Sequence, residues 1–275
     1  MMKINSLIVG IGDTGISTVN GIKAKNILND FRTVTLSDES AAKTSLAENA
    51  LTSKYEFADS EKFFPTPNTA VFVIVNSSNI FDVSLACEIG AVTARKGAFA
   101  VALAFVPSSN DELFDSSVRA LGELHEAFEG VVRFNEGYAA DFCFEVSEFF
   151  KTLSYSMSAS ASVRLADFSA VKAVLTSETD IYFASFHGFE RMDSHVFNSK
   201  CLCLRLCAQM CLDTANLITY FYSCGSDANK KIIDIFRTPI EKMSLGYLSD
   251  RKTYVSDKND EFCGGEFVFA VICAE

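Results

Sequence analysis

The stretch that decides the fold is IVGIGDTGISTVNGI, residues 8–22. It places Gly10, Gly12 and Gly15 between an apolar run typical of a buried strand and a segment with helical spacing, predicted over residues 16–28. Glycine lets backbone N–H groups come close to an anion, and the start of a helix adds a partial positive charge. The pattern therefore predicts an anion-binding turn between a strand and a helix.

A single match to GxGxxG leaves three interpretations open. The first is a dinucleotide site of the Rossmann type, with NAD(P) as cofactor and Asp38 as the acidic residue beyond the second strand. The second is a tight strand-to-helix turn that binds no ligand. The third is a site for another ligand that carries phosphate.

Composition limits the class of protein. The chain has 275 residues, of which 49% are hydrophobic and 21% charged, and its formal net charge is -11. That length suits one large domain or two closely associated ones, and the acidic surface repels nucleic acid and anionic lipid. No segment has the length of a membrane helix or the pattern of a signal peptide. We expect a cytoplasmic protein that binds neither nucleic acid nor a membrane directly.

The nine cysteines indicate no disulfide framework, because their number is odd and the chain shows no secretion signal. Within CLCLRLCAQMC, residues 201–211, Cys203, Cys207 and Cys211 recur every four residues. This spacing favours a buried helical stripe of small apolar side chains over a zinc site, whose ligands must converge. The three histidines are scattered, so no metal site is predicted.

Strand and helix patterns alternate through the first half, which is typical of a doubly wound α/β domain. The runs TAVFVIV (69–75) and AFAVALAFV (98–106) are continuously apolar, as in parallel strands covered on both faces. The other strands are predicted at 5–9, 31–36 and 130–134, the other helices at 81–96 and 111–127, and residues 38–64 look polar and less regular.

The second half of the sequence has a different residue pattern. A long helix is predicted over 138–157, and the strands after it are rich in β-branched and aromatic residues. These strands are predicted at 181–186, 217–223 and 266–274, with helices at about 197–213 and 228–242. The predicted organisation is a nucleotide-binding-type domain over 1–137, a central helix and loop over 138–164, and a C-terminal α/β domain over 165–275.

The run after the third glycine adds a resemblance. GIGDTGISTVNGI is similar to the first nucleotide loop of the tubulin/FtsZ superfamily, which FtsZ writes GxGGxGxNxVN. The glycines, Val19 and Asn20 match this loop, whereas Asp13, Thr14 and Ser17 depart from it. Further stretches resemble FtsZ in the same order, namely residues 71–105, 128–137, 138–157 and 165–175. The resemblance implies a Rossmann-type GTPase domain joined by a central helix to a smaller α/β C-terminal domain.

The resemblance also implies a ligand and a mode of action. In the family, GTP is held by one subunit and the catalytic loop of the next subunit completes the site, so the implied partner is the chain itself, head to tail, or another FtsZ-like protein. The implied ligand is GTP or GDP, with Mg²⁺ bound only together with the nucleotide. Asn135 and Tyr138 are the implied contacts to the base. The implied nucleotide-binding residues of the first loop are Gly10, Gly12, Asp13, Thr14, Gly15, Ser17 and Asn20.

Two family motifs are eroded. The loop that wraps the phosphates, GGGTGTG in FtsZ, corresponds to SNIFDVS at residues 78–84, which has no glycine. Its polar residues are Ser78, Asn79 and Asp82 besides Ser84, and Ser78 or Asn79 is suited to capping the next helix. A carboxylate at Asp82 would repel a triphosphate by on the order of 1–4 kcal/mol. We therefore expect an ordinary strand-to-helix turn here.

The catalytic loop, NxDFxDV in FtsZ, corresponds to LADFSAV at residues 165–171. Asp167 matches the first acidic position, but Leu165 and Ala170 replace the family's asparagine and second aspartate. One carboxylate cannot by itself both orient water and position a cation. Beyond the last predicted strand we also expect no counterpart of the family's C-terminal tether to membrane adaptors.

The sequence thus predicts an FtsZ/tubulin-like cytoskeletal or assembly protein with a degenerate nucleotide site. Its GTP hydrolysis is expected to be lost or very weak, with weak binding of guanine nucleotide, in a family that serves cell division among other processes. One alternative is an active self-assembling GTPase in which Arg164 or Lys172 supplies positive charge. A second is an NAD(P)-linked oxidoreductase, although the chain shows no catalytic dyad for one.

Overall fold

The computed structural model describes most of the first half of the chain and the main strands of the second. The described residues are 5–24, 31–59, 63, 69–107, 110–135, 139–156, 172, 175–178, 180–189, 217–223, 253–254, 257–259 and 266–274. The chain divides into two compact units, unit 1 with residues 1–147 and 175–180, and unit 2 with residues 148–174 and 181–275.

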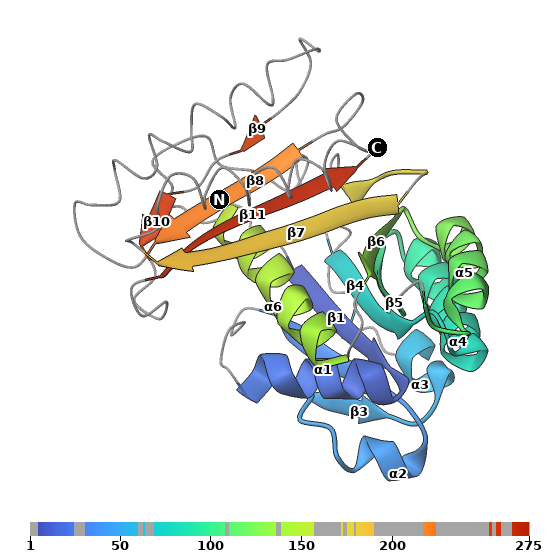
Figure 1. Ribbon diagram of the computed structural model, residues 1–275. Coiled ribbons are helices and arrows are strands. Elements are labelled where there is room, and N and C mark those ends of the chain that lie inside the picture. The colour runs from blue at the N-terminus through green and yellow to red at the C-terminus, as the bar shows by residue number, and fades with distance from the viewer. Residues whose placement is uncertain are drawn as a thin grey trace. The chain divides into compact units, whose positions relative to one another are not determined.

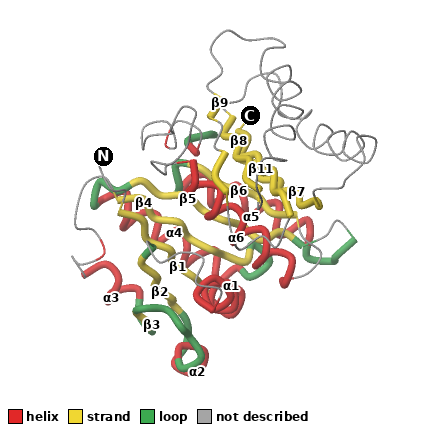
Figure 2. The backbone as a smooth tube through the Cα atoms, turned by 90° about the vertical axis from the view of Figure 1, so that its left-hand side faces the viewer, coloured by secondary structure: helices red, strands yellow, loops and turns green. Residues whose placement is uncertain are grey.

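Unit 1 is built on six parallel strands in the order β6-β5-β4-β1-β2-β3, which can be followed across the sheet in Figure 2. The strands are β1 Asn5–Ile11, β2 Arg32–Leu36, β3 Asn49–Leu51, β4 Thr69–Asn76, β5 Phe99–Val106 and β6 Gly130–Asn135. The order reverses between β1 and β4, where the chain crosses from one half of the sheet to the other. At such a point the turns after neighbouring strands diverge and leave room for a ligand.

Helices cover both faces of this sheet (Figure 1). They are α1 Gly12–Ala24, α2 Glu39–Ala42, α3 Lys54–Asp59, α4 Ile80–Arg95, α5 Phe114–Ala127 and α6 Ala139–Ser156. One face packs against α3, α4 and α5, and the other packs against α1 and the first half of α6. In α6, Phe142 makes edge-to-face contacts with Phe105 and Phe134. Because both faces are covered, β4 and β5 are buried along almost their whole length, as their continuous apolar runs predict.

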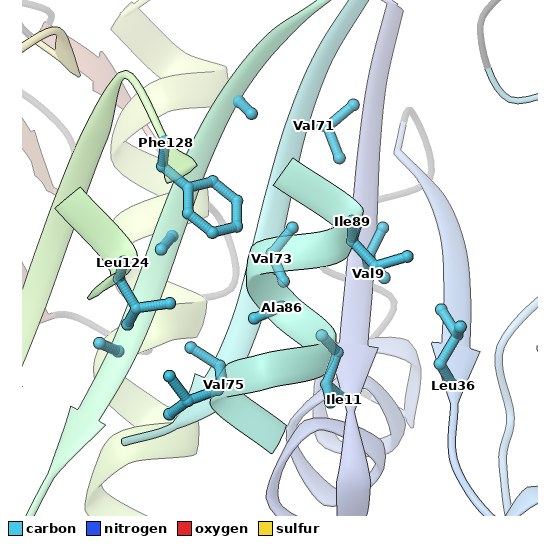
Figure 3. Packing of buried hydrophobic residues seen from close by; sticks show 14 of the residues in the cluster. Val9, Ile11, Leu36, Val71, Val73, Val75, Ala86, Ile89, Leu124 and Phe128 are labelled. Carbon is cyan, nitrogen blue, oxygen red and sulfur yellow. The ribbon is translucent and has the colours of Figure 1, made fainter. Parts of the chain in front are cut away.

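The main core lies under α4 and α5. Figure 3 shows Ala86 and Ile89 of α4 facing Val9 of β1 and Val73 of β4, with Leu124 of α5 farther along the sheet. All five side chains are completely buried. Spacing of three to four residues on the helix and of two on each strand brings these side chains to one shared layer.

Two predictions about local structure were wrong. Helix α1 begins at Gly12, one turn before the predicted start at residue 16, so Gly10 lies in β1 and Gly12 and Gly15 lie in the first turn of the helix. Residues 38–64, predicted to be polar and less regular, contain α2, β3 and α3, and β3 adds a parallel strand at the edge of the sheet. These three elements were missed because they are short and weakly periodic, and sheet pairing rather than local pattern stabilises a three-residue strand.

The described part of unit 2 contains strands and the end of α6. The strands are β7 Asp180–Phe189, of which Asp180 belongs to unit 1, β8 Leu217–Ser223, β9 Thr253–Tyr254, β10 Asp257–Asn259 and β11 Glu266–Ala274. Strand β11 lies between β7 and β8 and is antiparallel to both. The predicted strands at 217–223 and 266–274 are confirmed, whereas the predicted helices at 197–213 and 228–242 and the cysteine cluster lie outside the described residues.

Candidate functional site

The turn from β1 into α1 is held by close backbone contact. A Cβ atom added to Gly10 would lie 2.5 Å from the carbonyl oxygen of Gly15, and one added to Gly15 would lie 2.5 Å from the carbonyl carbon of Gly10. The two glycines therefore lie against each other where strand and helix cross, and neither position has room for a side chain. This packing explains two of the three glycines without a ligand.

Gly12 stands between them at φ +62°, in the left-handed region that favours glycine. Both carboxylate oxygens of Asp82, in the first turn of α4, lie 2.6 Å from the position that a Gly12 Cβ would take. The side chain that closes over the glycine turn thus comes from the segment that corresponds to the family's phosphate-wrapping loop. In the described part of the chain, no hydrogen bond reaches this carboxylate.

The surroundings of Asp82 disfavour its charge. Burial raises the pKa of the Asp82 carboxyl to about 6, and the nearby carboxylate of Asp13, in the first turn of α1, adds to the rise. The starts of two helices meet here, an arrangement that would ordinarily favour an anion. Burial and the neighbouring carboxylate raise the pKa of Asp82 more than the two helix starts lower it. The space in front of α1 is therefore already occupied by two carboxyl groups.

The turn from β4 into α4 is stabilised by its own polar side chains. The Asn76 side-chain oxygen accepts from the backbone N–H of Ser78 at 3.0 Å and from its hydroxyl at 2.7 Å. The Asn79 side-chain oxygen accepts from the N–H of Phe81 at 3.0 Å and caps α4. The ordinary strand-to-helix turn predicted at residues 78–84 is therefore what the structure contains.

A cavity of about 540 Å³ opens between these turns, at the carboxyl ends of β1 to β4. Its charged side chains are the carboxylates of Asp13, Asp38 and Asp82 and one cation, Lys54, which forms an exposed ion pair with Glu88. The residues that line it are Gly12, Asp13, Leu36, Ser37, Asp38, Ala41, Thr52, Ser53, Lys54, Tyr55, Asn79, Phe81, Asp82 and Leu85. No group of three acidic, His or Cys side chains among the described residues is arranged to hold a metal ion.

Other predicted site residues have local roles. The Asn20 amide donates to the carbonyl of Thr44 at 2.8 Å and accepts from the N–H of Leu46 at 2.6 Å, so it binds the loop before β3. Asp38, the candidate ribose ligand of a dinucleotide site, caps α2 by accepting from two backbone N–H groups. Thr14 accepts at its carbonyl from the hydroxyl of Thr18, and Ser17 is exposed on α1.

The remaining candidates are only partly described. Asn135 is the last residue of β6, and its side chain lies outside the described residues, as do Tyr138 and the candidate catalytic residue Asp167. The structure therefore brings the first glycine turn together with Asn79 and Asp82, while the predicted contacts to the base and the catalytic loop stay predictions.

The contribution of the β3–α3 connection to the cavity was not predicted from the sequence. Thr52, Ser53, Lys54 and Tyr55 all line it. A local signal was present, because Ser53 and Glu56 have the S-x-x-E spacing of a capping box. In the structure the Ser53 hydroxyl accepts from the N–H of Tyr55 at 3.2 Å at the start of α3.

The raised pKa of Asp82 predicts how stability depends on pH. Because the folded carboxyl holds its proton more tightly than the unfolded one, stability falls as the pH rises from the ordinary value of 3.8 through about 6. A shift of this size equals about 3 kcal/mol in a dry site, and screening at a half-buried group reduces it to about 1 kcal/mol. Above pH 7, we expect the free energy of unfolding of Asp82→Asn to be about 1 kcal/mol higher than that of the wild type.

This difference should disappear near pH 4, where the wild-type carboxyl is protonated in both states. Urea unfolding at both pH values measures it, with Glu112→Gln as a control at an exposed carboxylate just before α5. An advantage of Asp82→Asn that is equal at both pH values would contradict the assignment of the charge.

Solved structures show which fold this is. A mutant FtsZ from M. jannaschii superposes with a TM-score of 0.74 at 13% identity, covering 98% of this chain and 90% of that one. A GDP-bound CetZ1 monomer from Haloferax volcanii superposes with a TM-score of 0.68 at 12% identity, covering 98% of this chain and 94% of that one. GDP-form protofilaments of TubZ from Bacillus thuringiensis serovar israelensis give a TM-score of 0.65 at 11% identity, covering 99% of this chain and 89% of that one. The chain has the tubulin/FtsZ-like fold, as the resemblance implied.

At the level of sequence, neither a family profile nor a curated protein matches the chain. None of the helices that the structure describes combines the length and the apolar character needed to cross a membrane.

Proposed function

We propose that this chain, folded like FtsZ, CetZ and TubZ, is an FtsZ/tubulin-like protein that acts through assembly or partner binding and does not turn over GTP. It binds guanine nucleotide weakly at most. The observation that carries this proposal is the position of Asp82, whose carboxylate lies against Gly12 at the start of α1.

The glycine turn is the only cradle that the motif offers to a phosphate, and the Asp82 side chain stands at its entrance. A phosphate that enters between the two turns meets the carboxylates of Asp82 and Asp13. Each such contact costs on the order of 1–4 kcal/mol at surface to intermediate dielectric. The N-terminus of α1 offers typically 0.3–1 kcal/mol in return, so the balance is unfavourable.

The second turn offers little compensation. Its polar side chains already bond to the turn itself, and the first residues of α4, Ile80 and Phe81, are large and apolar. The one cation of the cavity, Lys54, is paired with Glu88 and faces three carboxylates. These residues do not fit a Mg²⁺-bound triphosphate, which is ordinarily surrounded by backbone N–H groups and cations.

A related structure supports the choice of assembly as the mode of action, because TubZ is described there as GDP-form protofilaments. A chain with this fold can lose its contacts to nucleotide and still keep the surface through which it contacts other proteins. We propose that this surface carries its function.

The test measures nucleotide content, phosphate release and affinity for GDP. We expect freshly purified protein to contain no stoichiometric GTP or GDP and to release no phosphate from GTP above background, with or without Mg²⁺. We expect Asp82→Gly, which removes the carboxylate and restores glycine beside the cradle, to raise the affinity for GDP about tenfold. Glu112→Gln serves as the matched loss of an exposed charge and should leave the affinity unchanged.

One bound nucleotide per wild-type chain would contradict the proposal. So would turnover of GTP that Asp167→Ala abolishes, which would favour the active GTPase instead. Stabilisation by NADH with no response to GTP or GDP would favour the oxidoreductase alternative.

A further inference from the structure

A second cavity lies in the groove between α3 and α4, on the face of the sheet that these helices cover (Figure 1). Its volume is about 280 Å³, and each helix contributes a small side chain to its lining, Ala58 on α3 and Ala91 on α4. Ile89 and Val92, only 0% and 8% exposed, form its inner wall. Packed helices ordinarily fill such a groove with interlocking side chains, so the two alanines leave apolar space here.

The charged side chains of this cavity lie at its two ends. At one end Lys54 pairs with Glu88, and its ammonium group lies 5.5 Å from the centre of the Tyr55 ring. At the other end Arg95 is exposed, and it forms no ion pair with any residue that the structure describes. Glu88 and Arg95 lie two turns apart on one face of α4, a rise of about 10 Å.

These features indicate the chemical class of a ligand. The guanidinium group of Arg95 can hold a carboxylate through two parallel hydrogen bonds, and the apolar walls favour an uncharged chain. Lys54 and Glu88 neutralise each other, so the cavity is suited to one negative charge and not to the two of a phosphate ester. The volume is just below the range of about 300–1,000 Å³ that drug-sized ligands occupy, so a smaller molecule fits.

We propose that the cavity between α3 and α4 binds a small monocarboxylate with an apolar chain, its carboxylate on Arg95 and its chain along Ile89 and Val92. This site goes beyond the proposed function, because it is formed by another cavity and involves no nucleotide. Arg95 lines this cavity and not the acidic one in front of α1, whereas Asp82 lines the acidic cavity and not this one. Binding at the two sites can therefore be tested separately.

Arg95 has a matched control in the next residue. Arg95 and Lys96 both lie at the end of α4, where a cation is favourable beside the helix C-terminus. Lys96 is also exposed, but it is not part of the cavity lining. The two residues would share a role in helix stability, whereas a role in binding belongs to Arg95.

Isothermal titration calorimetry of the full chain with octanoate, below the concentration at which it forms micelles, tests the inference. We expect saturable binding of octanoate, and Arg95→Gln should raise the dissociation constant about tenfold by removing a charge-assisted contact. Lys96→Gln should leave the constant unchanged. Ala91→Leu, which keeps every charge and places a good helix former on α4, should weaken binding by filling the cavity. The alcohol 1-octanol, with the same chain but no charge, should bind about tenfold more weakly. Circular dichroism establishes that the variants are folded.

Each other outcome overturns the inference. Absence of saturable binding contradicts it, and 1-octanol that binds as tightly as octanoate contradicts the role given to the carboxylate. Equal effects of Arg95→Gln and Lys96→Gln contradict the assignment to Arg95, and wild-type affinity in Ala91→Leu contradicts the assignment to this cavity. A chain that binds neither octanoate nor nucleotide would overturn this inference and leave the proposed function standing. Octanoate binding together with GTP turnover in the phosphate-release assay would support this inference and overturn the proposed function.

Discussion

Gly15→Ala is expected to lower the free energy of unfolding by about 3 kcal/mol, although alanine is ordinarily the better residue inside a helix. The added methyl group would lie 2.5 Å from the carbonyl carbon and 2.8 Å from the Cα of Gly10, and 3.2 Å from the carbonyl oxygen of Ile74. All three atoms belong to the backbone, so no rotamer change can relieve the contact. Helix α1 would have to move away from β1 and β4, with loss of packing along its buried face.

The control is the same substitution on another helix. A Cβ added at Gly122, in α5, meets nothing within 4 Å, so Gly122→Ala should stabilise the protein by about 0.5–1 kcal/mol. Urea unfolding followed by far-UV circular dichroism measures both variants. If Gly15→Ala is as stable as the wild type, the close packing of β1 and α1 does not explain the glycines.

Asp180→Ala is expected to cost about 3 kcal/mol, because the carboxylate is the shared partner of two nearly buried side chains. One oxygen of Asp180 lies 2.8 Å from Nε2 of His125, at the end of α5, and the other accepts from Arg133, on β6, at 3.2 Å. The three side chains are only 16–19% exposed. Removal of the carboxylate takes a charged acceptor from Arg133 and a hydrogen-bond partner from His125 at once.

Among the described residues, the histidine has no second partner to compensate. Its Nδ1 is buried and has no hydrogen bond within the described part of the chain. The bond to Asp180 is therefore the interaction that orients the imidazole ring, and its loss leaves both ring nitrogens unsatisfied.

The same carboxylate predicts a pH dependence. Burial raises the pKa of Asp180, but the hydrogen bonds and charges of His125 and Arg133 more than offset this, so the net shift is downward. A lowered pKa means that the contribution to stability is present above the ordinary value of 3.8 and is lost as the pH falls through the folded pKa.

We therefore expect the wild type to lose its advantage over Asp180→Ala only in strong acid, and to keep it in full at pH 7. Glu123→Gln, at an exposed carboxylate on α5, is the control and should change stability by less than about 0.5 kcal/mol. A wild-type advantage that vanished already at pH 6 would contradict the role given to Asp180.

Much of the fold could be predicted because it depends on patterns within single segments. Continuous apolar runs are sufficient to identify β4 and β5, since a strand covered on both faces needs apolar side chains at every position. The regular spacing of buried residues likewise identified α4 and α5 to within three residues. Short elements such as β3 gave no such signal, because pairing with β2 stabilises them.

The candidate site was predictable only in part. The absence of glycine from residues 78–84 predicts an ordinary turn, and Asn79 does cap α4. The role of Asn20 was not predictable, because its partners lie 24 and 26 residues away in a loop of no particular pattern. Its amide matches a family motif in sequence yet binds the protein's own backbone.

The sequence alone determined that a strand, a glycine turn and a helix begin this chain, since glycine is a local requirement of a tight crossing. Only the tertiary structure decided what each glycine faces: Gly10 and Gly15 face each other, and Gly12 faces the carboxylate of Asp82 from a helix 70 residues farther along the chain. The physical reason is that space and charge at a turn depend on atoms brought there by the packing of distant segments. No pattern within residues 8–22 contains that information.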